Sequence, residues 1–354
     1  MRSIHLRDGA ILVSVLGTIA VLALACTVEE VAELTPEDEL WQQATLVFQP
    51  LPEAAPNPDN PVTQAKIDLG KELYLDKRLS KDETISCNSC HSLATFGVDN
   101  LPFSPGDTGE LGGRNSPTVL NAALHVAQFW DGRAEDVEEQ AGMPILNPVE
   151  MAIPSEEFLV DRLSEIAGYQ EAFAAAFPDD DPPLSYANIS RALAAFERTL
   201  LTPSRFDLYL RGDRAALTGD EKEGLRIFKK IGCTACHNGM TAGGHTFRKF
   251  GINEPYWEHT LSPNQDEGRF AVTGAEADRY VFKVASLRNV EMTYPYFHDG
   301  SIEDLEDAVR VMAALQIGAD LSDSQAAQLA AFLRSLTGET PAVEAPTEED
   351  TPAG

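Results

Sequence analysis

The sequence predicts a mainly α-helical protein, built as two related domains with long irregular loops. Three observations lead to this fold class. Apolar residues recur with the helical period in several segments. A five-residue string, Cys-x-x-Cys-His, occurs at 87–91 and again at 233–237. A helical segment precedes each copy, so the order of elements repeats and indicates an internal duplication in outline.

The helix before each motif is predicted from its apolar stripe. In residues 62–74 this stripe consists of Ile67, Gly70, Leu73 and Tyr74. Ahead of the second motif, Thr218 and Glu221 have the spacing of a capping box. The helix that they begin has a stripe of Leu225, Phe228 and Ile231.

The boundary between the domains is predicted where helical periodicity stops. A helix is expected over residues 187–201, and Thr202-Pro203-Ser204 breaks the pattern. We therefore expect an N-terminal domain over 46–203 and a C-terminal domain over 204–338. The C-terminal domain should close with a helix that is capped by Ser322 and Gln325 and stopped by Gly338.

Each five-residue motif is typical of a covalent haem c site. Thiols of Cys87 and Cys90, or of Cys233 and Cys236, can bond to the two vinyl groups of a haem, and the following His91 or His237 can bind the iron. A zinc site would need further Cys or His pairs nearby, and a redox-active dithiol has no need of the trailing histidine. Two haems would also give the long loops 92–120 and 238–285 a surface to pack on.

The two ends of the chain have a different composition. Residues 1–26 have the anatomy of a secretory signal, with an apolar run that ends in small residues at Cys26. Ordinary cleavage, lipidation of Cys26 as a lipoprotein and an uncleaved anchor remain open, and each places the protein in the periplasm or tethers it to the membrane there. The acidic segments 27–45 and 339–354 are expected to be disordered.

The charge of the chain limits its partners. The 354 residues carry a formal net charge of −29, which disfavours binding to nucleic acid. An acidic body favours a basic partner such as a small cytochrome c, although it also serves solubility alone.

Further motifs make the chain resemble the bacterial di-haem cytochrome c peroxidases. The motifs are Arg114-Asn115-Ser116-Pro117-Thr118, Gln128-Phe129-Trp130-Asp131-Gly132-Arg133-Ala134, Asn147-Pro148-Val149-Glu150-Met151, Leu287-Arg288-Asn289-Val290 and Tyr294-Pro295-Tyr296-Phe297-His298-Asp299-Gly300. The resemblance, over about 50–338, implies two cytochrome c-like domains that reduce hydrogen peroxide to water. It also implies an N-terminal peroxidatic haem, a C-terminal haem that receives electrons from a soluble cytochrome c or cupredoxin, and often a homodimer.

The resemblance assigns roles to single residues. Met312 matches the second iron ligand opposite His237, a pairing that raises the potential of a haem. Glu150 and Gln140 match the catalytic pair, in which a carboxylate moves a proton between the peroxide oxygens. Trp130 matches an indole between the haems. From the residues alone, Met312 and Trp130 would be core packing and Glu150 a solvated acid.

The resemblance also implies a calcium site at the domain interface. Asn115 and the backbone carbonyls of Thr293 and Pro295 match its oxygen ligands. His298 is expected either near a haem edge or in a structural role.

The chain departs from the family at one position. Many members carry a removable histidine ligand about sixteen residues after the first haem-binding histidine, where this sequence has Asp107. Carboxylate is a poor ligand for such an iron, so we expect an open N-terminal haem that needs no reductive activation. Met143 and His125 are the alternative ligands.

Two other functions remain compatible with the motifs. A non-catalytic electron carrier or peroxide sensor would have a six-coordinate N-terminal haem. An oxidase acting on a protein or organic substrate is less favoured, because the related maturation enzyme of methylamine dehydrogenase has tyrosine at the position of Met312.

Overall fold

The computed structural model describes residues 34–262 and 264–341. These belong almost entirely to one compact unit, Pro36–Gly354. The predicted signal segment 1–26, Cys26 and most of the acidic tail 339–354 lie outside the described residues. Within the described part, no helix is both long and apolar enough to cross a membrane.

The prediction of a mainly helical protein is confirmed, and the described residues form a single two-stranded sheet. The helices are α1 (Pro36–Thr45), α2 (Gln64–Leu75), α3 (Cys87–Cys90), α4 (Val137–Leu146), α5 (Glu156–Ser164), α6 (Tyr169–Ala176), α7 (Tyr186–Glu197), α8 (Arg205–Leu210), α9 (Gly219–Lys230), α10 (Tyr256–Thr260), α11 (Phe270–Thr273), α12 (Leu305–Met312) and α13 (Asp323–Arg334). Strands β1 (Phe247–Lys249) and β2 (Val281–Lys283) pair antiparallel.

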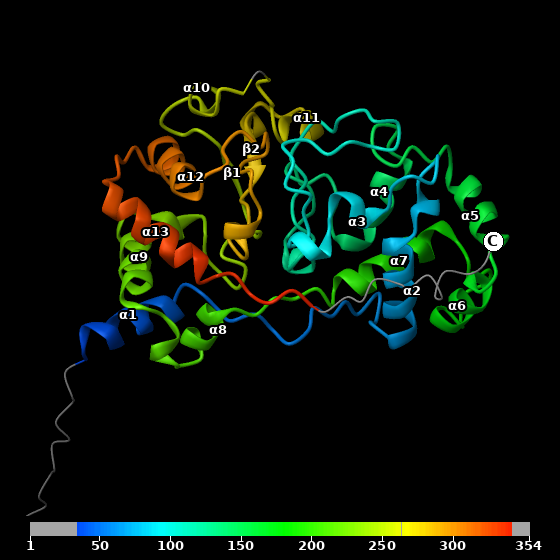
Figure 1. Ribbon diagram of the computed structural model, residues 1–354, viewed down its shortest axis with the longest axis horizontal. Helices are drawn as coiled ribbons and strands as arrows, with labels where there is room; N and C mark the ends of the chain where they lie inside the picture. The colour runs from blue at the N-terminus through cyan, green and yellow to red at the C-terminus, as the bar shows by residue number, and fades with distance from the viewer. Residues whose placement is uncertain (1–33, 263, 342–354) are drawn as a thin grey trace, which may run out of the picture. The chain divides into compact units, whose positions relative to one another are not determined.

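Two hydrophobic cores organise this unit. One is built around α2, α4, α5, α6 and α7, and the other around α1, α8, α9, α12 and α13 (Figure 1). Long loops and the β1–β2 pair lie between the two groups of helices (Figure 1). Each core buries an apolar stripe of the kind expected from the sequence, because a helix with one apolar face must cover it against a neighbour.

The same close helix crossing is found in both cores. A Cβ atom on Gly70 of α2 would lie 2.0 Å from the carbonyl oxygen of Ala192 on α7. On α9, a Cβ atom on Gly224 would lie 1.9 Å from the carbonyl oxygen of Gln328 on α13. Only glycine allows the two backbones to approach so closely, and the matching geometry agrees with an internal duplication.

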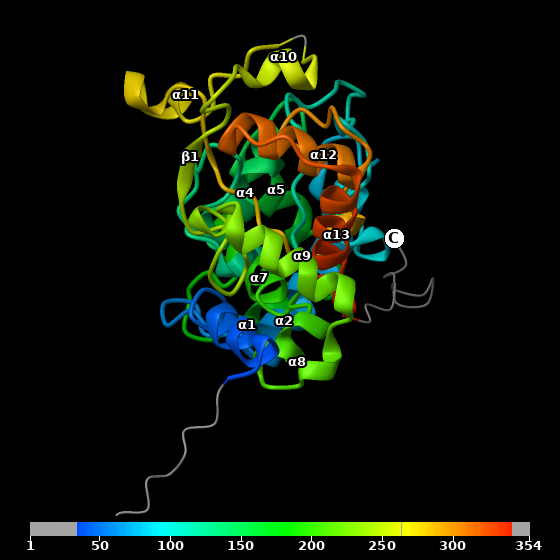
Figure 2. The same cartoon turned by 90° about the vertical axis from the view of Figure 1, so that its left-hand side faces the viewer.

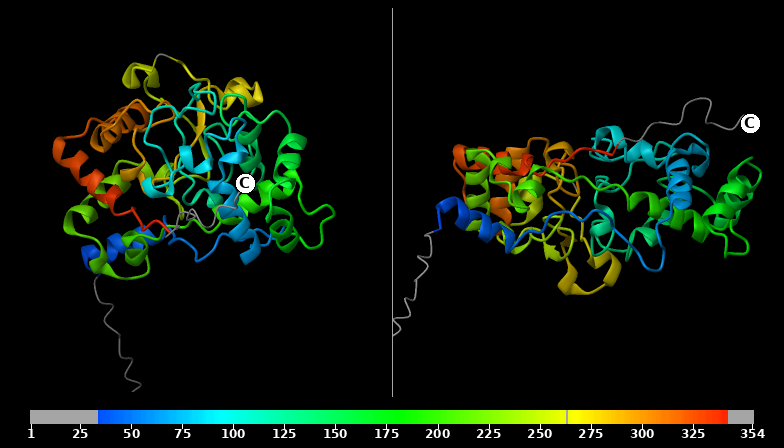
Figure 3. Two further views of the ribbon diagram at one scale, coloured as in Figure 1. Left: turned by 45° about the vertical axis from the view of Figure 1, so that its right-hand side comes forward. Right: turned by 90° about the horizontal axis from the view of Figure 1, so that it is seen from below.

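The start of the unit corrects one expectation. Residues 36–45 form α1, although the acidic segment 27–45 was expected to be disordered. Leu40 and Ala44 are buried in the second core, and Phe48 packs edge-on against Phe206 at 5.2 Å. Apolar burial on one face of α1 outweighs the acidity of its other face. Both views in Figure 3 place this blue segment beside the red C-terminal helix.

Buried and partly buried ion pairs connect distant parts of the chain. The Asp207 carboxylate accepts hydrogen bonds from both terminal nitrogens of Arg288, at 2.5 and 2.9 Å, and both side chains are almost fully buried. Arg114 donates to Asp131 at 2.6 Å and to Asp266 at 2.5 Å. The second network links residues of the first half to the loop that follows α10 near the top of Figure 2.

Candidate functional site

One continuous cavity joins the two Cys-x-x-Cys-His motifs. Its volume is about 1110 Å³, and both thiols and the histidine of each motif line it. Ligand cavities in proteins commonly hold several hundred cubic ångströms, so this space is large enough for bulky prosthetic groups. The lining surface is mostly apolar, and polar and charged side chains from both halves of the unit also contribute to it.

The first motif is held by α2 and by its own short helix. Cys87–Cys90 form α3, which begins at a capping box made by Ser86 and Ser89. The hydroxyl of Tyr74 on α2 donates to the carbonyl oxygen of His91 at 2.5 Å. Tyr74 is fully buried, so the backbone at His91 is fixed to the core.

The second motif follows α9 directly. Gly232 adopts φ 99°, which ends the helix and begins the turn that contains Cys233. Nδ1 of His237 lies 3.3 Å from the carbonyl oxygen of Ala242, so Nε2 is the nitrogen left for a metal. Met312 is the last residue of α12 and lines the same cavity, and the helix continues as a π-helical turn over Ala313–Ile317.

The electrostatics of the motifs disfavour the alternatives to haem. Burial raises the pKa of the thiols of Cys87 and Cys233 to about 12, whereas a redox-active dithiol needs a lowered pKa. The described residues contain no cluster of three or more His, Cys, Asp or Glu that could hold a zinc ion. Burial lowers the pKa of His237 to about 4, which keeps the imidazole neutral and able to bind iron.

A covalent haem therefore fits each motif. The thiols form no disulfide, they line a large apolar cavity, and a neutral histidine follows each pair. The residues that would hold the two groups are Cys87, Cys90 and His91, and Cys233, Cys236, His237 and Met312.

The predicted catalytic pair lines the same cavity. Gln140 lies on α4, and Glu150 lies just after this helix in the turn that Asn147 begins. The Glu150 carboxylate accepts a hydrogen bond from the Asn147 side chain at 2.7 Å. Burial raises the pKa of Glu150, while the charge of Arg133 and the Asn147 bond oppose this shift. A carboxyl group in such a setting can take up and return a proton.

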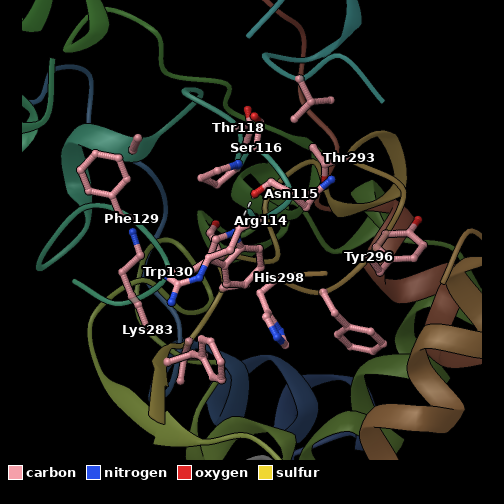
Figure 4. Close-up of a pocket in the computed structure, with 18 of the residues that line it drawn as sticks. Arg114, Asn115, Ser116, Thr118, Phe129, Trp130, Lys283, Thr293, Tyr296 and His298 are labelled. Atoms are coloured by element: carbon pink, nitrogen blue, oxygen red, sulfur yellow. Dashed lines mark hydrogen bonds between the residues drawn. The ribbon is translucent and has the colours of Figure 1, made fainter. Parts of the chain in front are cut away.

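Trp130 occupies a position where the two halves of the unit meet. Its indole Nε1 donates to the carbonyl oxygen of Asn115 at 2.8 Å, and its own carbonyl accepts from the Lys283 backbone at 2.7 Å. His298 lies beside it, with ring centroids 6.3 Å apart (Figure 4). The indole is thus held between a loop of the first half and strand β2.

The predicted calcium ligands lie along one stretch of the cavity wall. Asn115, Thr293 and Pro295 all line the cavity, and Figure 4 shows Asn115 close to Thr293. The Asn115 amide nitrogen donates to the Leu101 carbonyl at 2.9 Å. Its side-chain oxygen accepts no hydrogen bond from the described residues, which leaves an oxygen donor of the type that calcium prefers.

Asp107 does not line the cavity. Its carboxylate accepts hydrogen bonds from the Asp82 backbone at 2.7 Å and from the Thr84 hydroxyl at 2.5 Å. Its own backbone N–H donates to the carbonyl oxygen of Glu150 at 2.7 Å. A Cβ atom on the preceding Gly106 would lie 1.8 Å from the Val149 carbonyl. The loop is therefore fastened over Val149 and Glu150 and directs its acidic side chain away from the cavity.

The structure separates the two alternative ligands. Met143 is 37% exposed and lines a different, shallow cavity beside Tyr186. His125 is partly buried and lines the large cavity, where its Nδ1 lies 3.4 Å from the Lys283 amine. Of the two, only His125 is brought to the candidate site.

Sequence reasoning missed the buried Lys283. Its amine donates to the carbonyl oxygen of Ala127 at 2.8 Å and lines the cavity below Trp130 in Figure 4. Burial lowers its pKa to about 7, against the charge of Asp131. The only signal in the sequence is a single lysine inside the apolar run Tyr280-Val281-Phe282-Lys283-Val284, which also suits an edge strand.

Comparisons with known proteins agree with these features. Residues 64–215 match the family described as di-haem cytochrome c peroxidase. The cytochrome c551 peroxidase of Pseudomonas aeruginosa is 45% identical over 316 residues, covering 88% of this chain and 90% of its own length. The cytochrome c551 peroxidase of Nitrosomonas europaea is 46% identical over 290 residues, covering 80% and 85%. The methylamine utilization protein MauG of Methylorubrum extorquens is 35% identical over 308 residues, covering 83% and 85%.

Solved structures share the fold. The crystal structure of a MauG-like protein associated with microbial copper homeostasis has a TM-score of 0.73 and 30% identity, covering 82% of this chain and 94% of its own. The di-haem peroxidase BthA of Burkholderia thailandensis has a TM-score of 0.65 at 20% identity, covering 82% and 90%. The resemblance drawn from the sequence motifs is confirmed.

Proposed function

Because the chain belongs to the di-haem cytochrome c peroxidase family, we propose that it reduces hydrogen peroxide to water with electrons from a small soluble cytochrome c or cupredoxin. The observation that carries the proposal is the single cavity, which contains both Cys-x-x-Cys-His motifs and has Glu150, Gln140 and Trp130 in its wall. Haem bound at the motifs would supply the iron that binds peroxide and the means of electron transfer. The protein side chains supply position and proton transfer.

Each half of the unit has its own part in the proposed reaction. His237 and Met312 would hold the C-terminal haem, and a nitrogen with a thioether ligand would give that haem a high potential suited to receiving electrons. Trp130 would lie on the path from there to the N-terminal site at His91. The hydrogen bonds that fix the Trp130 ring and backbone support this path, since a fixed ring keeps the distances between donor and acceptor constant.

Glu150 moves the proton in this proposal. Its carboxylate would take a proton from one oxygen of hydrogen peroxide and return it to the other oxygen, which leaves as water. The Asn147 side chain holds one carboxylate oxygen at 2.7 Å, which orients the group. Gln140 lines the same cavity from α4 and can donate a hydrogen bond to the peroxide.

In this proposal the N-terminal site would be accessible to peroxide in the resting protein. Asp107 binds the backbone and hydroxyl of residues 82–84 instead of facing the cavity, which supports a peroxidase that needs no reductive activation. Asn115, Thr293 and Pro295 would bind a calcium ion, which would fix the two halves relative to each other. The proposed location is the periplasm, either free or tethered through Cys26, and the proposed assembly is a homodimer.

The test is the electron paramagnetic resonance spectrum of the fully oxidised holoprotein, followed by peroxide turnover without pre-reduction. One high-spin haem and immediate turnover are expected. Two low-spin haems would contradict the open site and point to His125 as a ligand. Negligible turnover even after half-reduction would favour an electron carrier or peroxide sensor instead.

A further inference from the structure

Five ring side chains form a continuous path from the cavity toward the surface. The centroids of Trp130 and His298 are 6.3 Å apart, those of His298 and Tyr256 5.0 Å, and those of Tyr256 and Trp257 5.2 Å. Tyr280 lies 5.0 Å from Trp257 and 6.2 Å from Tyr256. We refer to these five residues as the aromatic chain. Separations of this size put neighbouring rings in contact.

The aromatic chain is buried in its middle and partly accessible at its outer end, while Trp130 at the inner end is partly buried and lines the cavity. His298 and Tyr256 are 3% and 0% exposed. Trp257 and Tyr280 are partly exposed, on α10 and just before β2. Figures 1 and 2 show α10 at the periphery of the unit. An electron removed from Trp130 can therefore be replaced from rings that reach solvent.

Hydrogen bonds hold the buried middle of the aromatic chain in place. The Tyr256 hydroxyl donates to the Asp266 carbonyl at 3.1 Å, and the Asp266 carboxylate pairs with Arg114 at 2.5 Å. The carbonyl oxygen of His298 accepts from the Asn115 backbone at 2.8 Å. The contacts between the rings thus depend on a network that also fixes the loop beneath Trp130.

This cluster contains more easily oxidised side chains than packing alone requires. Apolar residues such as Phe250 and Phe282 share the same cluster and would fill space equally well. Tryptophan and tyrosine are the side chains that lose an electron most readily, and here they occupy the outer positions. We propose that the aromatic chain carries oxidising equivalents from the haem cavity to Trp257 and Tyr280 when no electron donor is bound.

This inference rests on the proposed peroxidase function, which supplies the oxidant. One hydrogen peroxide takes two electrons and two protons and gives two water molecules. One indole that loses two electrons and two protons and gains one water molecule becomes a hydroxylated ring. The overall change is one peroxide and one tryptophan to one hydroxytryptophan and one water. The partly exposed position of Trp257 lets the protons pass to solvent.

The aromatic chain would protect the buried residues beside the cavity. Oxidation at the partly exposed end spares Trp130, and a soluble reductant can restore a surface radical before it reacts further. The aromatic chain thus carries oxidising equivalents to the surface only when electrons from the donor do not keep pace with the supply of peroxide.

The test treats the holoprotein with a small excess of peroxide without donor and maps hydroxylated residues by peptide mass spectrometry. Trp41 is the internal control, because it is partly buried, donates to the Tyr209 carbonyl at 3.0 Å and lies outside the aromatic chain. We expect Trp257 to be modified several-fold more than Trp41, and the modification to disappear when reduced donor is added first. Equal modification of both residues would overturn the inference.

Two matched variants provide the second measurement. Trp257→Phe with Tyr280→Phe keeps aromatic bulk, and Trp41→Phe is the control. The double variant should turn over peroxide normally with donor but lose activity several-fold faster in peroxide alone. If the double variant is inactivated by peroxide at the same rate as the wild-type protein, the proposed role of the aromatic chain is wrong. If the wild-type protein shows no peroxide turnover with donor, the proposed function itself is wrong and the inference falls with it.

Discussion

Replacement of Gly224 by alanine tests the closest helix contact in the C-terminal core. The added Cβ would lie 1.9 Å from the Gln328 carbonyl oxygen, whereas ordinary contact begins at 3.4 Å. The clash is with a backbone atom, so no side-chain rotation relieves it. Helices α9 and α13 must therefore move apart by roughly 1.5 Å, the difference between 3.4 Å and 1.9 Å. Overpacking of this kind costs about 1–3 kcal/mol, and the helix propensity of alanine returns only about 1 kcal/mol.

The expected net loss of stability is about 2 kcal/mol, since lost packing between Phe228 and Phe332, whose rings are 5.3 Å apart, adds to the strain. Thermal unfolding of the holoprotein, followed by far-ultraviolet circular dichroism, measures it. Gly219→Ala in the same helix is the matched control, because its Cβ would meet nothing within 4 Å. If the two variants unfold at the same temperature, the close crossing does not limit stability and the reasoning is wrong.

Three further predictions address the site and the buried ion pair. Glu150→Gln should lower kcat/KM for peroxide by about 10²–10⁴-fold. The Glu150 carboxylate accepts a proton only when it is ionised, and burial raises its pKa, so wild-type activity should decrease as the pH is lowered, with a midpoint above the ordinary 4.5. This decrease should be absent from the pH profile of the variant. Met312→Ala should lower the midpoint potential of the C-terminal haem in a spectroelectrochemical titration, and an unchanged potential would exclude the thioether ligand. Asp207→Asn should cost about 3 kcal/mol because it leaves Arg288 buried without its counter-charge, whereas the surface variant Asp323→Asn should cost less than about 1 kcal/mol. Burial alone would raise the pKa of Asp207, but the charge of Arg288 and the N–H groups that donate to the carboxylate hold this pKa below 3.8. The stabilisation from ionised Asp207 should therefore be fully present above pH 3.8 and should disappear as the pH falls through the lower pKa of the folded state. Equal urea midpoints for Asp207→Asn and wild type would refute this.

Local signals were sufficient for the helices and the attachment motifs. The capping boxes of Thr218 with Glu221 and of Ser322 with Gln325 form as expected, because each involves residues three positions apart. The two Cys-x-x-Cys-His strings point to haem for the same reason, since all their chemistry lies within five consecutive residues.

Local signals failed for α1. Its acidic residues suggested disorder, but Leu40 and Ala44 face a core whose other buried members, apart from the nearby Phe48, lie more than 150 residues further along the chain. The amino-acid composition of such a helix is dominated by its exposed, acidic face. It does not indicate which distant segment buries the apolar face.

The sequence by itself determined the mainly helical fold class and the family, and it supplied the residues that we propose hold two haems, because short patterns specify helices and covalent attachment. Only the tertiary structure decided that Asp107 turns away from the cavity and that Lys283 is buried beside His125. It alone brought Trp130 within reach of Tyr256 and Trp257, through His298. These arrangements join segments that are far apart in the chain, and such contacts depend on how the two cores and their loops pack together, which no local pattern encodes.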